Sequence, residues 1–214
     1  MITIKTFTFN PFLENTYLLY DDSKECIVID PGCYENHEKE ELKDYISSHG
    51  LKVVQLLNTH CHIDHVSGNQ FIKTTYGVPL SIHKLDEATL NAVPSYASSY
   101  GFQHFESSTP DNFLDEGDQV CFGNSCLEIV FVPGHAPGHI AFYNVEQKFC
   151  IGGDVLFDGS IGRTDLPGGN HEQLIKSIQS KFFSWEDDMV VYCGHGSTTT
   201  IGKEKRSNPF CAVT

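Results

Sequence analysis

Short apolar runs that end at glycine, proline or a polar turn recur along most of the 214-residue chain and restrict the folds it can adopt. Short runs with β-branched and aromatic members are typical of strands. We expect strands at 2–9, 16–20, 26–30, 53–57, 80–82, 119–122, 127–132, 140–144, 148–151 and 189–193. Two strand-rich halves with helices between them indicate two sheets packed together and covered by helices on the outside.

Helices are predicted where apolar residues recur at helical spacing between these strands. We expect them over 38–49, around Phe71 and Ile72, over 84–92, and from Asn170 onward with Leu174, Ile175, Ile178 and Phe182 facing inward. Asn170 is expected to cap its helix together with Gln173, three residues further on. Between 94 and 115, serine, proline and aromatic residues fit either a long ordered loop over a site or a plain surface excursion.

A cluster of histidines and one carboxylate follows the strand that ends at Leu57. The string His60-Cys61-His62-Ile63-Asp64-His65 holds three imidazoles and an aspartate within six positions. Imidazole nitrogen and carboxylate oxygen suit zinc and other borderline divalent ions, and a loop at a strand end lets such side chains converge. Chance produces such a string in on the order of one in a thousand chains of this length. The cluster therefore predicts a metal site.

Three further candidate ligands follow other predicted strands, each directly after a glycine. They are His135 after Gly134, Asp154 after Gly153, and His195 after Gly194. With them the set of candidate metal ligands grows to seven side chains.

These motifs, in this order, resemble those of the metallo-β-lactamase superfamily over nearly the whole chain. The resemblance implies a single domain over residues 1–214 with an αββα fold, in which two mixed β-sheets are sandwiched between outer helices and the site lies at one edge of the sheets. It also implies two divalent ions, zinc above all, with iron possible at one or both sites. By the resemblance, His60, His62 and His135 bind one ion, Asp64, His65 and His195 bind the second, and Asp154 bridges them.

Within the superfamily, Gly162–Gly169 and Lys205–Phe210 resemble the glyoxalase II (hydroxyacylglutathione hydrolase) branch, whose substrates are thioesters such as S-lactoylglutathione. That branch has a helical extension after the last histidine motif, which supplies much of the glutathione site. Here only Gly196–Ser207 separate His195 from Asn208, so we expect this chain to lack the extension. Thioester chemistry is therefore better supported than glutathione as the thiol carrier.

The ligand set predicts a hydrolase that uses a metal-bridging hydroxide. Two divalent ions lower the pKa of a shared water to about 7 and polarise the carbonyl that it attacks. Besides binding a metal, Asp64 is the expected catalytic residue, since its carboxylate can accept a hydrogen bond from the hydroxide and orient it. The thiolate leaves with little need of a general acid because the pKa of a thiol is modest.

Residues around the ligands give weaker predictions. Asp165 is expected either to orient a ligand imidazole from outside the ligand shell or to be an ordinary turn residue. Arg163 is expected either to bind a substrate carboxylate or to be a surface charge. The resemblance places further carboxylate-binding side chains at Lys203, Lys205 and Arg206. The histidines assigned to surface or structural positions are His37, His49, His83, His104 and His171.

Composition excludes several other classes of function. A net charge of −14 argues against nucleic-acid binding, which depends on clustered lysine and arginine. No stretch is long and apolar enough to span a membrane or to serve as a secretory signal, so we expect a cytoplasmic protein without a membrane partner. The resemblance implies a small-molecule thioester as its partner. The eight scattered cysteines are interpreted as reduced core thiols in preference to disulfides.

Two other functions fit the same residues. One is a persulfide dioxygenase of the same fold, with a single iron held by His60, His135 and Asp154. The other is a metal-binding module that has kept the fold and lost turnover. The complete ligand set argues against the second.

Overall fold

The computed structural model describes residues 1–213, and internal contacts divide them into two compact units. Unit 1 comprises Met1–Leu114 together with Cys121–Cys126. Unit 2 comprises Asp115–Val120 and the chain from Leu127 onward. The single domain expected over residues 1–214 stays a prediction.

Unit 1 contains a mixed sheet. Its strands, in spatial order, are β1 (Thr3–Phe9), β2 (Glu14–Tyr20), β3 (Glu25–Ile29), β4 (Lys52–Leu57), β5 (Leu80–His83) and β6 (Asn112–Leu114). The strands β1, β2 and β3 are antiparallel neighbours, whereas β3 to β6 pair in parallel. Parallel neighbours need crossover connections, which helices usually supply. As a result, the carboxyl ends of β3 and β4 lie at one edge of the sheet.

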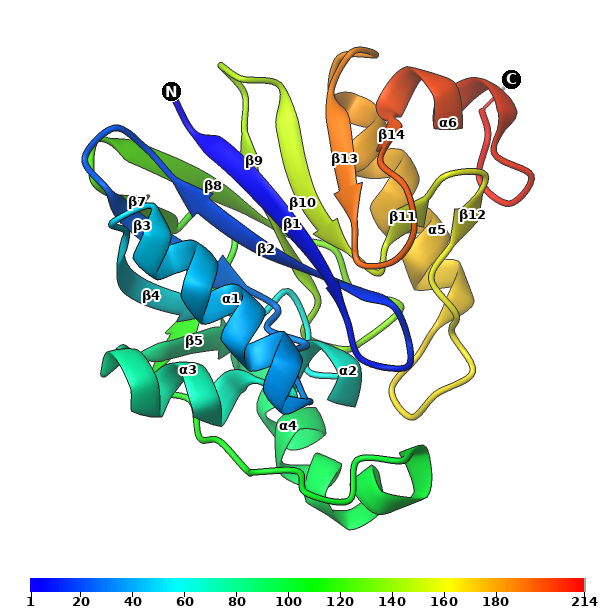
Figure 1. Cartoon of the computed structure of the whole chain (residues 1–214). Helices are drawn as coiled ribbons and strands as arrows, with labels where there is room; N and C mark the ends of the chain where they lie inside the picture. The colour runs from blue at the N-terminus through cyan, green and yellow to red at the C-terminus, as the bar shows by residue number, and fades with distance from the viewer. Residues whose placement is uncertain (214) are drawn as a thin grey trace. The chain divides into compact units, whose positions relative to one another are not determined.

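Helices cross between these parallel strands and cover the sheet of unit 1 (Figure 1). They are α1 (Asn36–Ser48), α2 (Ile63–Val66), α3 (Asn69–Tyr76) and α4 (Glu87–Tyr96), with short 3₁₀ turns η1 (Lys84–Asp86) and η2 (Ala97–Tyr100). Leu42 and Ile46 of α1 and Ile72 of α3 are buried in one core cluster with strand residues. Burial of these apolar faces is the main stabilising contribution.

The second sheet lies mostly in unit 2. Its strands, in spatial order, are β14 (Thr199–Thr200), β13 (Val190–Cys193), β10 (Phe149–Gly153), β9 (Ile140–Asn144), β8 (Ser125–Phe131) and β7 (Gln119–Phe122). A small hairpin, β11 (Leu156–Phe157) and β12 (Ser160–Ile161), stands beside it. The neighbours β10 and β13 pair in parallel, and α5 (His171–Ser180) lies in the crossover between them. A 3₁₀ turn, η3 (Phe182–Ser184), and α6 (Ile201–Ser207) complete the unit.

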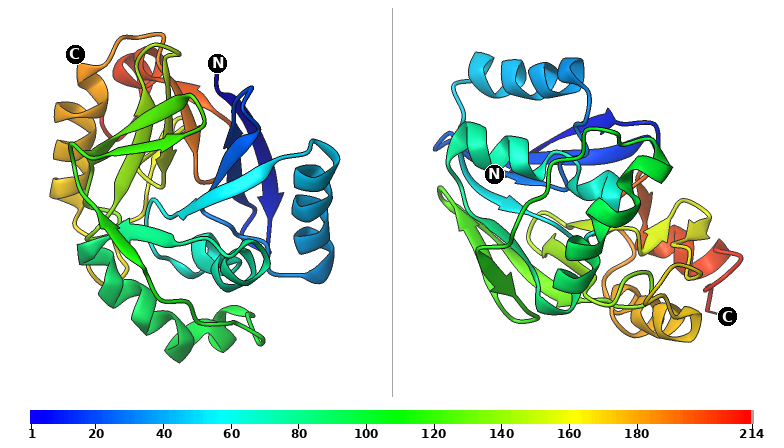
Figure 2. Two further views of the ribbon diagram at one scale, coloured as in Figure 1. Left: turned by 90° about the vertical axis from the view of Figure 1, so that its left-hand side faces the viewer. Right: turned by 90° about the horizontal axis from the view of Figure 1, so that it is seen from below.

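The helix α5 runs alongside the strands of unit 2 (Figure 2). Its predicted cap is confirmed, because Asn170 Oδ1 accepts a hydrogen bond from the Gln173 N–H at 3.0 Å. Leu174, Ile178 and Phe182 are fully buried in the core of the unit, as their spacing predicts.

The segment 94–115 is more regular than expected. Helix α4 continues through Pro94 to Tyr96, and a 3₁₀ turn follows it directly. Val93 and Ala97 are buried in the unit 1 core on either side of the proline, so tertiary packing outweighs its helix-breaking tendency. Helix α6 was not among the predicted elements either, since Ile201 is its one large apolar residue.

The cysteine prediction is confirmed for part of the set and wrong for two residues. Among residues 1–213, buried free thiols are found at Cys26, Cys33, Cys61, Cys150, Cys193 and Cys211. Cys121 and Cys126 instead form a disulfide across the exposed tip of the β7–β8 hairpin. The hairpin brings their Cα atoms to 4.0 Å, which the sequence pattern alone did not indicate. Within the described chain, no helix has the length and apolar composition to cross a bilayer.

Candidate metal centre

The carboxyl ends of β3 and β4 bring together the ligand candidates of unit 1. His60 and His62 lie in the loop after β4, and Asp64 and His65 lie on the short helix α2 that follows. The ring centroids of His60 and His65 are 4.1 Å apart, and those of His60 and His62 are 4.8 Å apart. His65 Nε2 lies 3.7 Å from Asp64 Oδ2. Three imidazoles and a carboxylate therefore converge at this edge of the sheet.

Asp30, directly after β3, orients two of these imidazoles. Its carboxylate accepts hydrogen bonds from Thr59 N–H at 2.7 Å and Thr59 Oγ1–H at 2.6 Å. Its Oδ2 also lies 3.1 Å from His65 Nδ1, and Thr59 Oγ1 lies 3.1 Å from His60 Nδ1. A carboxylate only accepts, so His65 carries its proton on Nδ1, and Nε2 is its candidate metal-binding nitrogen. Asp30 is thus occupied as an orienting group although it stands within ligand distance of both rings.

Two side chains from other segments hold the backbone of this loop. Asn10, after β1, donates through Nδ2 to the main-chain oxygen of Asp64 at 3.0 Å. Asp86, fully buried at the end of η1, accepts a hydrogen bond from the Cys61 N–H through Oδ2 at 2.6 Å. The backbone on both sides of His62 is therefore fixed.

The acidic and thiol groups behind the loop are deeply buried. Burial raises the pKa of Glu14 well above its usual value, against the opposing effect of His65 nearby. Burial likewise raises the pKa of the Cys61 thiol, and the adjacent Asp86 carboxylate raises it further. A thiol that stays protonated is a poor metal ligand, so Cys61 is a core residue and not a candidate ligand.

The three remaining candidates converge within unit 2. One oxygen of Asp154, Oδ2, lies 3.6 Å from His135 Nε2 and 3.5 Å from His195 Nε2. Asp154 follows β10 and His195 follows β13, and these parallel neighbours end at the same edge, where Gly194 N–H donates to Gly153 O at 2.8 Å. The donor set is again imidazole and carboxylate, which fits zinc or iron.

A main-chain oxygen orients the ring of His135, whose Nδ1 donates to Arg163 O at 2.7 Å. The Asp165 carboxylate accepts two hydrogen bonds from the Arg163 guanidinium, both at 2.7 Å. That Asp165 orients a ligand imidazole stays a prediction. Hydrogen bonds from Arg163 lower the pKa of Asp165 to about 2.

The basic residues near the end of the chain are also paired. Lys203 binds Asp158, Lys205 donates to Trp185 O at 2.8 Å, and Arg206 lies 2.9 Å from Asp187. These contacts attach α6 to the rest of unit 2. The carboxylate-binding role of Lys203, Lys205 and Arg206 stays a prediction.

Several supporting residues were missed by the sequence reasoning: Asn10, Asp30, Asp86 and His139. His139 is fully buried, and its Nε2 accepts the Asp154 N–H at 3.0 Å. A polar residue next to a predicted strand end was the available signal, and it applies to Asp30 and His139. Nothing in the pattern around Asp86 distinguishes it from a surface aspartate.

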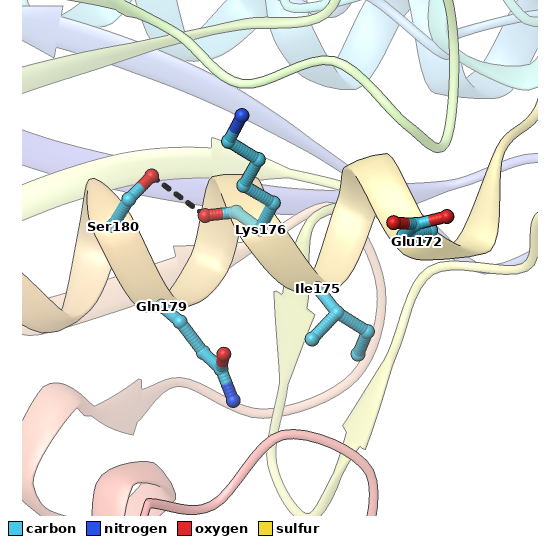
Figure 3. A pocket seen from close by; sticks show the side chains of 5 residues that line it. All are labelled: Glu172, Ile175, Lys176, Gln179 and Ser180. Carbon is cyan, nitrogen blue, oxygen red and sulfur yellow. Dashed lines mark hydrogen bonds between the residues drawn. The ribbon is translucent and has the colours of Figure 1, made fainter.

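A surface pocket lies away from these ligands, on the exposed side of α5 (Figure 3). It is lined by Glu172, Ile175, Lys176, Gln179 and Ser180, none of them a candidate ligand. Ser180 Oγ donates back to Lys176 O at 2.6 Å, as serines on helices often do. The pocket therefore presents helix side chains and no chemistry of its own.

Comparison with known proteins connects both groups of ligands to one family. Residues 9–195 match the metallo-β-lactamase superfamily. A hydroxyacylglutathione hydrolase, GloC, from Haemophilus influenzae is 41% identical over 201 residues, which cover 93% of each chain. The crystal structure of the B3 metallo-β-lactamase BLEG-1 aligns with a TM-score of 0.89 at 31% identity, covering 99% of this chain and 100% of that one. The protein TTHA1623, in a di-iron-bound form, aligns with a TM-score of 0.85 at 34% identity, covering 96% and 99%.

Proposed function

Because the chain belongs to the metallo-β-lactamase superfamily and is a metallo-hydrolase with the α/β fold of that family, we propose that it hydrolyses thioesters in the manner of glyoxalase II. The relative named hydroxyacylglutathione hydrolase, 41% identical over 93% of both chains, supports this reaction. The proposed substrates are small-molecule thioesters of the S-lactoylglutathione type. The proposed location of the protein is the cytoplasm.

We assign His60, His62 and His135 to one metal, Asp64, His65 and His195 to a second, and Asp154 to both. The observation that carries this assignment is the position of Asp154 Oδ2, which lies within 3.6 Å of Nε2 of His135 and of His195, one imidazole from each set. A single carboxylate oxygen between two imidazoles is the arrangement expected of a bridging ligand. Zinc is the proposed metal. Iron at one or both sites is the proposed alternative, because a 34% identical protein has been crystallised in a di-iron-bound form.

When bound, two divalent ions supply a Lewis acid for the thioester carbonyl and an attacking water of lowered pKa. The side chains of this protein orient that chemistry. Asp30 and the carbonyl of Arg163 hold the imidazoles of His65 and His135 with Nε2 toward the site. Asp64, with its side chain 13% exposed, accepts the hydrogen bond of the attacking water at its carboxylate. The leaving thiolate needs no acid group, because the pKa of a thiol is about 8.5.

Arg163 is the proposed contact to a carboxylate of the thiol carrier. Its side chain is 60% exposed, and its guanidinium is paired with Asp165, only two residues away. Exposed ion pairs of this kind contribute little stability, about 0 to 1 kcal/mol, so a substrate carboxylate can displace Asp165 at small cost.

The test combines metal analysis with an activity screen. We expect about two zinc or iron ions per chain and hydrolysis of S-lactoylglutathione by the wild type. The double variant His60→Ala/His135→Ala should lose both metal and activity, whereas His37→Ala, at an exposed position on α1, should keep both. The screen uses S-lactoylglutathione, other thioesters, β-lactams and glutathione persulfide, on zinc-loaded and iron-loaded protein.

Each other outcome contradicts the proposal in its own way. Oxygen consumption with glutathione persulfide, without thioester hydrolysis, would assign a persulfide dioxygenase. Bound metal without activity on any of the substrates would assign a non-catalytic metal-binding module.

A further inference from the structure

A buried histidine outside the proposed ligand set contacts the peptide of Asp154. His139 is 0% exposed, and its Nε2 accepts the hydrogen bond of the Asp154 N–H at 3.0 Å. Because that nitrogen accepts, the neutral ring carries its proton on Nδ1. The imidazole therefore presents a directed acceptor to one main-chain N–H, which an apolar residue of similar size cannot do.

The strand register explains why these two residues meet. β9 and β10 are antiparallel, with Ile151 opposite Phe142, and continuing this register beyond the strand ends places Asp154 opposite His139. The main-chain oxygen of His139 is turned the other way, where it accepts the Val132 N–H at 2.9 Å. The Asp154 N–H is consequently received by the side chain of His139 in place of a regular ladder bond.

The loop that ends at His139 also carries His135. Residues 132–139 connect β8 to β9, and the rings of His135 and His139 are 6.0 Å apart. One short loop thus supplies an imidazole that faces the Asp154 carboxylate and another that holds the Asp154 peptide. The orientation of the Asp154 peptide restricts the position of its Cα–Cβ bond, from which the carboxylate extends, so this hydrogen bond bears on the position of the carboxylate.

We propose that His139 is a positioning residue, whose hydrogen bond to the Asp154 N–H places the Asp154 carboxylate between the two metals; the inference rests on the proposed two-metal function. Residues that orient ligands from outside the metal shell are worth about 10-fold to 100-fold in metal affinity or activity. The role is specific to the acceptor nitrogen and does not follow from burial alone.

The experiment compares four proteins by zinc affinity, measured in competition with a chromophoric chelator, and by the visible spectrum of the Co²⁺ form. His139→Leu fills the space without an acceptor, whereas His139→Gln offers an amide oxygen to the same N–H. Ile178→Ala, on the buried face of α5, is the control for general loss of stability in unit 2. The melting temperature of each metal-free protein is measured in parallel.

We expect His139→Leu to bind zinc about 10-fold to 100-fold more weakly and to show a changed Co²⁺ spectrum. His139→Gln should stay within about threefold of the wild type, and Ile178→Ala should lower the melting temperature without changing zinc affinity. Unchanged affinity in His139→Leu, no rescue by glutamine, or an equal loss in Ile178→Ala would each overturn the role of His139. A wild type that binds no metal would overturn the proposed two-metal function as well. The other outcomes of this experiment concern His139 alone.

Discussion

Single side chains here act mainly by fixing the direction of other groups. Asp30 accepts hydrogen bonds from Thr59 and His65. Asp86 accepts a hydrogen bond from the Cys61 N–H, and Asn10 donates one to the Asp64 carbonyl. Each is an acceptor or donor matched to one partner, and buried polar groups are costly when such a partner is removed. The precision of the metal centre therefore depends on residues that bind no metal.

Gly162 is a position where an added methyl group should displace the groups that orient the proposed ligands. A Cβ there would lie 1.9 Å from Asp154 O and 3.1 Å from His135 Nδ1. We expect Gly162→Ala to lose about 1 to 3 kcal/mol of stability and to weaken metal binding, measured by denaturant unfolding and metal competition. Gly159→Ala, which strains a positive φ of 71° but meets open space, is the matched control and should keep its metals. Full metal retention in Gly162→Ala would contradict the expectation.

Arg163 gives a second prediction at this scale, on substrate binding. Arg163→Ala should raise KM for S-lactoylglutathione about tenfold, the loss of one charge-assisted contact, while kcat changes little. The reason is that a contact to a remote carboxylate stabilises substrate and transition state equally. Lys181→Ala, which removes another exposed and paired cation, should leave both constants unchanged. An unchanged KM in Arg163→Ala would place the carrier elsewhere on the protein.

At the scale of elements, the proposed ligands and the residues that orient them lie near strand ends, and hydrogen bonds hold the segments that connect the strands. The tip of the β7–β8 hairpin is fastened within unit 1 in this way. Asp21, after β2, accepts hydrogen bonds from the Asn124 N–H and the Ser125 Oγ–H, both at 2.8 Å. The disulfide between Cys121 and Cys126 closes the same tip. One carboxylate and one covalent bond thus keep this turn in place.

Asp21 therefore makes stability depend on pH in the acid range. Burial alone would raise the pKa of Asp21, but hydrogen bonds from Ser23, Ser125 and Asn124 outweigh it and lower the pKa from 3.8 to about 2. A lowered folded-state pKa stabilises the protein above the unfolded value, and this contribution is lost as pH falls from about 4 to about 2. We expect Asp21→Asn to cost about 2 kcal/mol near neutral pH.

The measurement is the free energy of unfolding of wild type and Asp21→Asn as a function of pH. Their difference should shrink below about pH 4, where the wild-type carboxylate becomes protonated. Asp22→Asn, at the exposed neighbouring position, should match the wild type throughout. A difference that does not depend on pH would assign the effect to packing.

At the scale of the whole molecule, the proposed ligands come from both halves of the chain, with four residues in unit 1 and three in unit 2. Metal binding therefore depends on the folded chain, because the unfolded chain holds these residues far apart. A ligand that binds only the folded state stabilises it by mass action.

Metal removal should accordingly lower the melting temperature. At a free zinc concentration of about one hundred times Kd, the stabilisation is about 2.7 kcal/mol. We expect a chelator to remove it, added zinc to restore it, and His60→Ala/His135→Ala to show no response to either. Calorimetry with and without chelator makes the comparison. A wild-type melting temperature that changes neither with chelator nor with added zinc would contradict the proposed metal centre.

Local patterns were sufficient for much of this protein. Short apolar runs predicted most strands, and the residue pattern at Asn170 and Gln173 predicted the cap of α5, because these features depend on residues close in sequence. The family and its fold class followed from motifs at strand ends and are confirmed. The candidate ligands could also be predicted from the sequence, because a cluster of imidazole and carboxylate side chains is typical of a metal site.

Only the tertiary structure decided which groups orient those ligands. Asp30 meets His65 across 35 residues because β3 and β4 are parallel neighbours, and His139 meets Asp154 because β9 and β10 pair in one register. The same holds for the Arg163 carbonyl, which accepts the hydrogen bond of His135 Nδ1 across 28 residues. Strand order and register are set by burial of the whole core, so no local pattern around Asp30, His139 or Arg163 contains them.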